Sequence, residues 1–354
     1  MEHLYKEMVP ALLRWYDYNA RILPWRSEPT PYRVWVSEIM LQQTRVEAVK
    51  PYYDRFMAEL PDVKALAEVE DDKLMKLWEG LGYYNRARNL KAAAQTVLEE
   101  YGGELPDTYE QLLKLKGIGE YTAGAVASIA CKRAVPAVDG NVLRVVARLL
   151  ANGDDVLKLS TKRWMTQEIM SIIPEDRPGD FNQALMELGA TVCLPNGAPK
   201  CENCPWDTVC MAHKAGTEMN FPYKQPKKPR KIEEKEVYLL EWDGRYALRK
   251  RPKKGLLSGL WEFPTITCGQ NMDSVDNILA TARELSDNVD KIGRGKHIFS
   301  HIEWHMTGYH ILLQNQIEND SFVWVTKEEM EEEYAIPSAF EFMKDYLAVH
   351  EGTE

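Results

Sequence analysis

The chain has 354 residues, of which 45% are apolar and 28% charged, so its composition excludes wholesale disorder and collagen-like repeats and suggests two domains or three. It contains no run of 18 apolar residues, and its first residues lack the apolar stretch of a secretory signal, so we expect a cytoplasmic protein that does not span a membrane. The net charge of −10 at first sight speaks against a nucleic-acid partner. However, residues 315–354 hold 11 acidic and 2 basic side chains, whereas residues 224–254 hold 12 basic and 5 acidic side chains. DNA binding requires only a local basic face, so the net charge does not exclude it.

The first two thirds of the chain predict a helical domain. Apolar residues recur at helical spacing, and breakers such as Pro61, Gly102 and Gly117 separate the segments. Thr30 followed by Pro31 is typical of a helix start, because threonine caps the first turn and proline fits its first position. We expect helices over residues 8–15, 30–41, 46–60, 71–80, 86–101, 109–115, 121–132, 141–150, 161–172 and 181–192.

Residues 222–235 are rich in proline and charge, which is typical of a linker, so we expect one domain over 1–221 and another over 236–354. Beyond the linker the pattern changes to strands, beginning with 237–242 and 246–250 around the turn Asp243-Gly244. Further strand patterns cover 298–299, 309–313 and 322–325, and helical patterns cover 276–285 and 338–347. The second domain is therefore predicted to be α/β or α+β.

Four of the six cysteines fall within one short segment, with the spacing Cys193-x7-Cys201-x2-Cys204-x5-Cys210. In a reducing compartment such clustering favours a metal site over disulfides. Four thiolates suit either tetrahedral zinc or a cubane iron–sulfur cluster, and the absence of two paired C-x2-C units favours the cluster. The two remaining cysteines, Cys131 and Cys268, are expected to be buried core thiols.

Two acidic residues, Glu38 and Asp139, and a glycine-containing turn between them stand out by their surroundings. Glu38 lies among strongly apolar neighbours in 34–41; burial would raise its pKa and let it act as a general acid, although an exposed helical glutamate is the alternative. Gly117-Ile118-Gly119 leads into a helix and can expose backbone N–H groups to a phosphate, although a plain turn between helices would look similar. Asp139 stands where a later helix begins, and an ordinary N-cap is its simplest interpretation.

These segments together resemble the helix–hairpin–helix DNA glycosylases of the endonuclease III superfamily, and within it the adenine glycosylases of the MutY type. The likeness covers nearly the whole chain. The motifs that carry it are Leu23-Pro24-Trp25-Arg26, Ser37-Glu38, Met40-Leu41-Gln42-Gln43-Thr44, Gly80-Leu81-Gly82-Tyr83-Tyr84, the glycine hairpin, Val138-Asp139-Gly140-Asn141 and the four cysteines. The resemblance implies a multidomain protein, in which an all-α helix–hairpin–helix glycosylase domain with an iron–sulfur loop precedes an α+β Nudix-like domain.

The resemblance also implies a mechanism. Such enzymes bend the duplex and flip the target adenine out of the base stack. Glu38 would protonate adenine at N7, and Asp139 would stabilise the oxocarbenium-like sugar left behind. Bifunctional relatives carry a lysine where this chain has Tyr121, and because a tyrosine cannot form a Schiff base, a monofunctional hydrolase is implied.

Further roles follow from matched positions. Tyr121 and Asn141 would support the catalytic acids. The cysteines would hold one structural 4Fe-4S cluster, although this chain has seven residues between the first two cysteines where the family usually has six. The remaining matches place Trp25, Arg26 and Gln183 in the adenine pocket, Gln43 and Tyr83 as wedges in the base stack, and Gly117 and Gly119 at the DNA backbone.

The second domain resembles a Nudix fold, because residues 255–264 are similar to the segment before a Nudix box. Laid on this chain, the box places Val275 and Asn288 where two magnesium-binding carboxylates belong, so pyrophosphatase activity is not expected. In the resembling enzymes this domain reads 8-oxoguanine, and Phe299-Ser300-His301 matches the tripeptide that does so; a short core strand is the alternative. Basic residues of 227–231 and 249–254 could contact phosphates, or form solvated loops.

Four functions are compatible with parts of this pattern. The first is removal of adenine opposite 8-oxoguanine or guanine in double-stranded DNA by a monomer. The others are a pyrimidine glycosylase, a noncatalytic iron–sulfur DNA-binding protein, and a Nudix hydrolase with a helical appendage. The guanine-lesion tripeptide speaks against the second, Glu38 with Asp139 against the third, and Val275 with Asn288 against the fourth.

Overall fold

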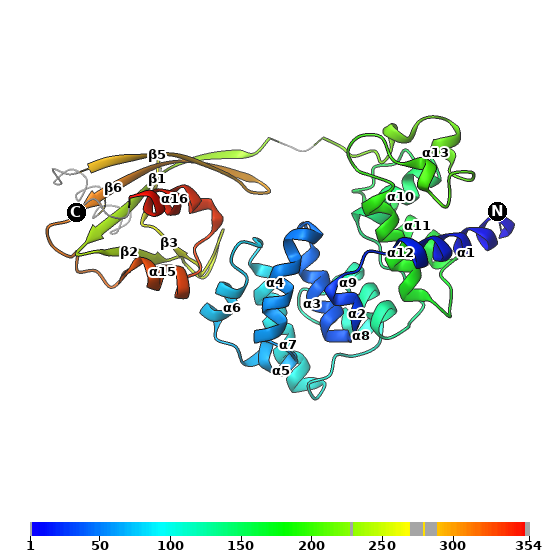
Figure 1. Cartoon of the computed structure of the whole chain (residues 1–354), viewed down its shortest axis with the longest axis horizontal. Coiled ribbons are helices and arrows are strands. Elements are labelled where there is room, and N and C mark those ends of the chain that lie inside the picture. The colour runs from blue at the N-terminus through cyan, green and yellow to red at the C-terminus, as the bar shows by residue number, and fades with distance from the viewer. Residues whose placement is uncertain (1, 227–228, 270–278, 280–288, 351–354) are drawn as a thin grey trace. The chain divides into compact units, whose positions relative to one another are not determined.

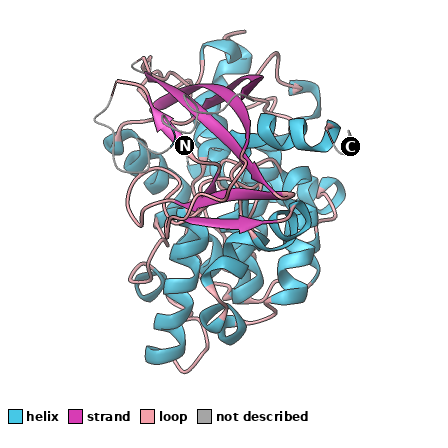
Figure 2. Cartoon of the chain, turned by 90° about the vertical axis from the view of Figure 1, so that its left-hand side faces the viewer, coloured by secondary structure: helices cyan, strands magenta, loops and turns pink. Residues whose placement is uncertain are grey.

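The computed structural model describes residues 2–226, 229–269, 279 and 289–350 of the chain (Figure 1). It divides into two compact units. One comprises Met1–Glu68 and Arg88–Pro226, and the other comprises Val69–Ala87 and Lys227–Glu354. Helices build the first unit and a sheet with flanking helices builds most of the second, as Figure 2 shows in cyan and magenta. The predicted change from helical to mixed structure is thus confirmed.

Most of these helices overlap the predicted segments, whereas α5 and α13 were not predicted. Their bounds are α1 (Glu2–Asn19), α3 (Pro31–Leu41), α4 (Val46–Glu59), α5 (Val63–Glu68), α6 (Asp71–Leu77), α7 (Asn85–Glu100), α8 (Tyr109–Leu112), α9 (Glu120–Ala125), α10 (Gly140–Leu149), α11 (Leu159–Met170), α12 (Pro178–Thr191) and α13 (Met211–Lys214). Two differences matter for the site. A short helix α2 (Pro24–Ser27) was not predicted, and the segment after α9 continues as a π-helical turn over Val126–Ala130.

Glycines let α12 approach its neighbours through backbone contacts. A Cβ atom at Gly179 would lie 2.7 Å from the Cα of Ile129 in the π-helical turn, and one at Gly189 would lie 2.6 Å from the Cβ of Asn141. Because real Cβ atoms essentially never come this close to other heavy atoms, only glycine fits at both positions. This contact sets α12 directly against the segments before and after Asp139.

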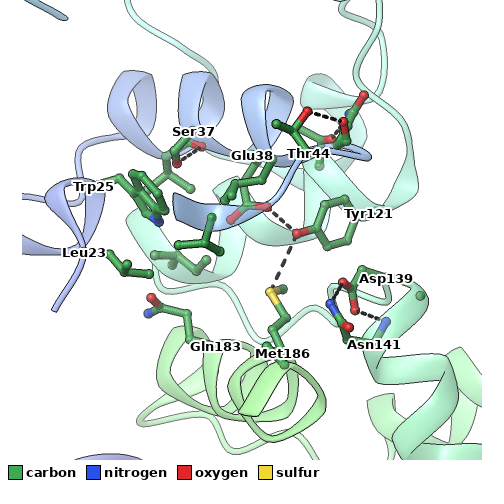
Figure 3. Close-up of a pocket in the computed structure, with 18 of the residues that line it drawn as sticks. Leu23, Trp25, Ser37, Glu38, Thr44, Tyr121, Asp139, Asn141, Gln183 and Met186 are labelled. Atoms are coloured by element: carbon green, nitrogen blue, oxygen red, sulfur yellow. Dashed lines mark hydrogen bonds between the residues drawn. The ribbon is translucent and has the colours of Figure 1, made fainter. Parts of the chain in front are cut away.

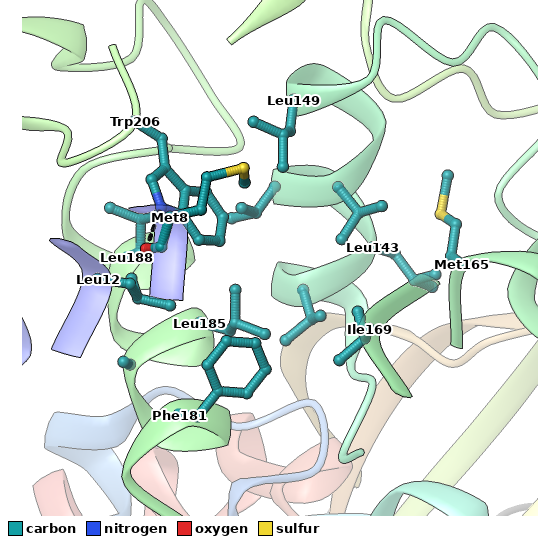
Figure 4. Close-up of a cluster of buried hydrophobic side chains, with 14 of the residues drawn as sticks. Met8, Leu12, Leu143, Leu149, Met165, Ile169, Phe181, Leu185, Leu188 and Trp206 are labelled. Atoms are coloured by element: carbon teal, nitrogen blue, oxygen red, sulfur yellow. Dashed lines mark hydrogen bonds between the residues drawn. The ribbon is translucent and has the colours of Figure 1, made fainter. Parts of the chain in front are cut away.

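An apolar core joins α1, α10, α11 and α12 to the cysteine-bearing loop (Figure 4). Phe181, Leu188 and Leu12 are completely buried in it. Trp206, from the loop between the cysteines, is also buried and donates a hydrogen bond of 2.9 Å from Nε1 to the main-chain oxygen of Met8. The loop is therefore fixed to the helical core by both apolar packing and a buried hydrogen bond.

The second unit contains a seven-stranded sheet with strand order β3-β2-β1-β6-β5, in which β4 pairs with β1 and β7 with β2. The strands are β1 (Lys231–Trp242), β2 (Arg245–Lys250), β3 (Trp261–Glu262), β4 (Thr265–Thr267), β5 (Val289–Ile298), β6 (Ile302–Leu312) and β7 (Phe322–Val325). Among the strands of the described residues, only the pairing of β1 with β6 is parallel. Helices α15 (Lys327–Glu333) and α16 (Glu341–Val349) complete an α+β unit.

Both faces of β1 are buried over residues 237–240. Val237 and Leu239 belong to one apolar cluster, together with residues of α16, whereas Tyr238 and Leu240 belong to the cluster on the opposite face. This burial on both faces explains why residues 237–240 form a continuous apolar run and do not alternate with polar residues. Strands β5 and β6 are much longer than the short segments predicted, because β5 is an edge strand whose exposed polar residues hide its pattern. The predicted helix over 276–285 and the Nudix-box positions Val275 and Asn288 lie outside the described residues.

Candidate active site

The first unit contains a cavity of about 670 Å³, within the roughly 300–1,000 Å³ typical of small-molecule sites. Its walls come from α2, α3, the glycine hairpin, α9, the start of α10, and α12. It brings together most residues that the sequence singled out, although they are widely separated along the chain. Those that line it are Trp25, Arg26, Glu38, Gln43, Gly117, Gly119, Tyr121, Asp139, Asn141 and Gln183.

Helix α3 carries Glu38 into this cavity. The helix begins as predicted, with Thr30 Oγ1 accepting a hydrogen bond of 3.3 Å from the backbone N–H of Arg33 and Pro31 at the first position. Its buried residues include Trp35, Val36 and Ile39, so the carboxyl lies in apolar surroundings and is only 6% exposed. The alternative of an exposed glutamate is therefore excluded.

Tyr121, on α9, donates a hydrogen bond to Oε2 of Glu38, and its hydroxyl also contacts Sδ of Met186 at 3.7 Å (Figure 3). Burial raises the pKa of Glu38 to about 7, and the negative charge of Asp139 adds to this effect. The Tyr121 hydrogen bond and the positive charge of Arg26 act in the opposite direction. A carboxyl with this pKa can hold a proton near neutral pH and release it to a bound molecule.

Asp139 is both an N-cap of α10 and a wall of the cavity. Its Oδ1 accepts hydrogen bonds from the backbone N–H groups of Asn141 (2.9 Å) and Val142 (2.8 Å), and its Oδ2 accepts one of 2.7 Å from the Asn141 side chain. Burial raises the pKa of Asp139, whereas the Val142 and Asn141 hydrogen bonds lower it. These three bonds fix the carboxylate and favour its ionised form.

Asn141 in turn connects to the cysteine loop through Arg144. Nη2 of Arg144 donates hydrogen bonds of 2.8 Å to Oδ1 of Asn141 and to the main-chain oxygen of Gly189, and its Nε donates one of 2.8 Å to the main-chain oxygen of Cys193. Arg144 is 5% exposed. We did not predict this residue, and its place five positions after Asp139, in the middle of a helix, gives no local signal.

The cavity is also lined by a buried carboxylate, Glu187, that the sequence analysis did not predict. Glu187, on α12, forms ion pairs with Arg21 and Arg26, and its side chain is completely buried. Arg21 and Glu187 both line the cavity. The available signal was the spacing of Gln183 and Glu187, which at i and i+4 share one face of a helix.

The four clustered cysteines line a second, smaller cavity next to Trp206. Cys193 follows α12 and Cys210 is the N-cap residue of α13, while Cys201 and Cys204 lie in the loop between them. All four are partly buried. Arg148, from α10, donates a hydrogen bond of 3.3 Å to Sγ of Cys193. Soft thiolate ligands converging on one cavity, with a cationic donor beside them, fit a cubane cluster.

The isolated cysteines do not match their prediction. Cys268 is exposed at the end of β4, and Cys131 is partly exposed at the end of the π-helical turn. Neither is a fully buried core thiol, because each lies just beyond the end of its element, where the chain returns to the surface.

The predicted wedge residues share an unusual backbone conformation. Gln43, in the first unit, has φ +58°, and Tyr83, in the second unit, has φ +48° with its side chain 49% exposed. Arg86 supports the loop of Tyr83 by donating hydrogen bonds of 3.0 Å to the main-chain oxygens of Leu81 and Gly82. Non-glycine residues at positive φ are uncommon and often mark functional positions.

The tripeptide Phe299-Ser300-His301 lies in the turn between β5 and β6, so the alternative of a core strand is excluded. Ser300 and His301 are exposed. The ring of Phe299 packs against Trp304, with 4.8 Å between the ring centroids, which anchors the turn while leaving its tip accessible. Of the basic residues nearby, Lys253 and Lys254 are exposed, whereas Arg249 and Arg251 pair with the buried Glu262.

None of the described helices has the length and apolarity needed to cross a membrane.

Comparisons with known proteins agree with this architecture. Residues 36–175 match the family model described as HhH-GPD superfamily base excision DNA repair protein, and residues 236–344 match the NUDIX domain model. The adenine DNA glycosylase of Rattus norvegicus is 35% identical, over 90% of this chain and 73% of the rat protein. That of Schizosaccharomyces pombe is also 35% identical, over 91% of this chain and 85% of the yeast protein.

Two solved structures resemble the helical part. A thermostable thymine-DNA glycosylase is 28% identical with a TM-score of 0.54, covering 60% of this chain and 97% of that one. A trapped endonuclease III–DNA covalent intermediate is 23% identical with a TM-score of 0.52, covering 61% of this chain and 98% of that one, and it supports the fold alone. The predicted fold class, a helix–hairpin–helix glycosylase domain followed by a Nudix-like domain, is confirmed.

Proposed function

The chain belongs to the adenine DNA glycosylase family of base excision repair, and we propose that it hydrolyses the N-glycosidic bond of adenine opposite 8-oxoguanine or guanine in duplex DNA. The observation that carries this proposal is the pairing of Glu38 and Tyr121 in a cavity that also contains Asp139. A protonated acid and a fixed carboxylate in one cavity are the two groups that glycosidic cleavage needs.

Glu38 acts as the general acid. With a pKa of about 7, roughly half of the Glu38 carboxyl groups are protonated at neutral pH, and the protonated form passes its proton to N7 of an adenine flipped into the cavity. The bond between N9 and C1′ then breaks, and its electron pair goes to the adenine. Water adds to C1′ and loses a proton, which restores the acid form of Glu38. General acid catalysis of this kind contributes roughly 10²–10⁴-fold to the rate.

Asp139 stabilises the positive charge that develops on the sugar. Its three hydrogen bonds from Asn141 and Val142 hold the carboxylate in place before the reaction, so no reorganisation is required when the charge appears. Trp25, Arg26 and Gln183 surround the base, with Trp25 buried on α2 and in edge-to-face contact with Tyr53.

The reaction is monofunctional. Tyr121 occupies the position of the Schiff-base lysine of bifunctional relatives, and among the described residues that line the cavity there is no lysine. Because these lining residues include no lysine, they offer no amine that could form an imine with C1′ and cut the strand.

The cysteines Cys193, Cys201, Cys204 and Cys210 would hold one 4Fe-4S cluster, which braces the loop and the adjoining α10 and α12. Its place next to Arg148 and Trp206, outside the catalytic cavity, suits a structural group. The second domain, which we assign to 236–354 beyond a linker over 222–235, reads the opposite guanine lesion through Phe299, Ser300 and His301. Gln43 and Tyr83 fill the gap left by the flipped base, and Gly117 and Gly119 contact the DNA backbone.

A single-turnover assay tests the proposal. Duplexes that contain A:8-oxoguanine, A:G, T:G or thymine glycol are incubated with excess protein, and abasic sites are measured with and without alkali. We expect adenine release from the first two only, with strand breaks only after alkali. Glu38→Gln should abolish release while retaining duplex binding, and Glu47→Gln, at an exposed glutamate of α4, is the matched control. Release of thymine, or strand breaks without alkali, would refute the assignment.

A further inference from the structure

Glu187 is the most buried carboxylate at the cavity, and the proposed mechanism gives it no role. It is 1% exposed and lies one turn after Gln183 on α12. Its Oε1 accepts hydrogen bonds from the backbone N–H (3.1 Å) and Nε (2.6 Å) of Arg21. Its Oε2 accepts hydrogen bonds from Nη2 of Arg21 (3.1 Å) and Nη2 of Arg26 (2.9 Å).

These contacts rule out a direct role in the reaction. Both carboxylate oxygens are already occupied by two donors each, and the side chain has no exposed surface. Although burial acts against it, pairing with Arg21 and Arg26 keeps the pKa of Glu187 below its usual range, so this side chain holds no proton to donate. A fully paired, ionised carboxylate can act only through its partners.

One of these partners is a cation near the general acid. Arg26 lines the same cavity as Glu38, and its positive charge favours the ionised form of that carboxyl. Two hydrogen bonds hold Arg26 in place, from Nη1 to the main-chain oxygen of Arg21 (3.0 Å) and from Nη2 to Glu187. Its guanidinium also lies 5.6 Å from the ring centroid of Tyr16.

An arginine without these restraints would favour a different partner. Guanidinium and carboxylate form strong bidentate pairs, and such a pair with Glu38 would remove the proton that the reaction requires. Three charged or titratable groups act on Glu38: Tyr121 from α9, Asp139 at the start of α10 and Arg26 from α2. Helix α12 adds one acidic group to the cavity, Glu187.

We propose that Glu187 is a positioning residue that, through its ion pairs, holds Arg26 against the wall of the base pocket and prevents it from pairing with the general acid Glu38. This inference rests on the proposed function, because it assigns Glu187 a role in the same reaction. A guanidinium has five N–H donors, and among the described contacts Arg26 uses two, so the fixed group still has donors for the nitrogen acceptors of a purine.

The test is the pH dependence of single-turnover adenine release, which a merely structural residue would not shift. In Glu187→Gln we expect the fall in rate on the alkaline side to move down by about one pH unit, giving about tenfold slower release at pH 8 and little change at pH 5.5. In the double variant Arg26→Gln/Glu187→Gln the competing cation is gone, so the alkaline fall should return toward its wild-type position.

Asp17→Asn is the matched control. It breaks the ion pair between Asp17 of α1 and Arg177 at the start of α12, and both of these side chains are partly exposed. Its pH profile should equal that of the wild type. If Glu187→Gln slowed release equally at every pH, or left the profile unchanged, the inference would be wrong while the proposed function stood. If the wild type released no adenine at all, the proposed function itself would fail.

Should Glu187→Gln not fold, as judged by circular dichroism, Arg26→Gln decides the question. If Glu187 restrains Arg26 as proposed, removing this cation moves the alkaline fall upward by less than about half a pH unit. An upward shift of about one unit or more would show that Arg26 already pairs with Glu38 in the wild type, and would overturn the inference.

Discussion

The Nε atom of Arg144 lies 2.8 Å from the main-chain oxygen of Cys193, so one buried guanidinium joins the proposed cluster loop to the side chain that holds Asp139. The path from Cys193 to the proposed catalytic carboxylate of Asp139 runs through Arg144 and Asn141. We therefore expect a change in the loop to alter the orientation of Asp139, and the two sites to respond together to changes in either.

Arg144→Gln should uncouple them. Its loss leaves buried acceptors at Gly189 and Cys193 without partners, each at a cost of about 1–3 kcal/mol, so we expect a clear decrease in the free energy of unfolding, measured with urea. Adenine release should slow at every pH. Arg163→Gln, at an exposed position of α11, is the control. Reduced stability with an unchanged rate of release would contradict the coupling.

The wild-type rate of adenine release should fall as the pH rises through about 7, because the proposed mechanism requires a protonated Glu38 and the pKa of this residue lies there. Tyr121→Phe removes a hydrogen bond that lowers the pKa of Glu38, so the alkaline fall should move upward, by up to about one pH unit. A single-turnover pH profile measures this shift. Tyr109→Phe, outside the described cavity lining, should leave it in place; a downward shift in Tyr121→Phe would contradict the assignment.

Glu38→Gln should stabilise the protein at alkaline pH. The unfolded chain loses the Glu38 proton near pH 4.5, whereas the folded chain keeps it until about pH 7, so the wild type loses stability between these values and the glutamine variant does not. The difference should reach about 3 kcal/mol at pH 8 and vanish near pH 4. Urea titrations at both pH values check this. Equal stability of the two proteins at pH 8 would mean that Glu38 is not kept protonated by burial.

The two hairpin glycines should respond differently to alanine. Gly117 has φ +81°, and a Cβ there would lie 2.6 Å from Cβ of Asn89, so Gly117→Ala should destabilise the fold by more than about 1 kcal/mol and weaken duplex binding. Gly119 has φ −97° and no atom within 4 Å of an added Cβ, so Gly119→Ala should retain the wild-type melting temperature. The opposite order of melting temperatures would refute this reading of the hairpin.

Much of the helical part was accessible from sequence because its signals are local. Thr30 and Pro31 marked the start of α3, and apolar neighbours correctly indicated burial of Glu38. Asp139 matched its simplest interpretation, an N-cap, and lines the cavity as well, so the two interpretations were not exclusive. The resemblance then placed Trp25, Tyr121 and Gln183 in positions that the structure brings into one cavity.

Long-range partners could not be predicted in this way. Glu187 meets Arg21 across 166 positions of sequence, and no periodic pattern records such a pairing. The full length of β5 was missed for a different reason: an edge strand buries only part of each face, so Lys291 and Lys296 look like loop residues until β6 is seen beside them.

The backbone contacts at Gly179 and Gly189 also limit how this enzyme could be redesigned. Because a Cβ atom at either glycine would overlap with Ile129 or Asn141, neither position accepts a side chain unless the segments that flank Asp139 also shift. Attempts to admit a larger or differently substituted base would have to work through side chains that line the cavity, such as Val34, Leu41 or Val46.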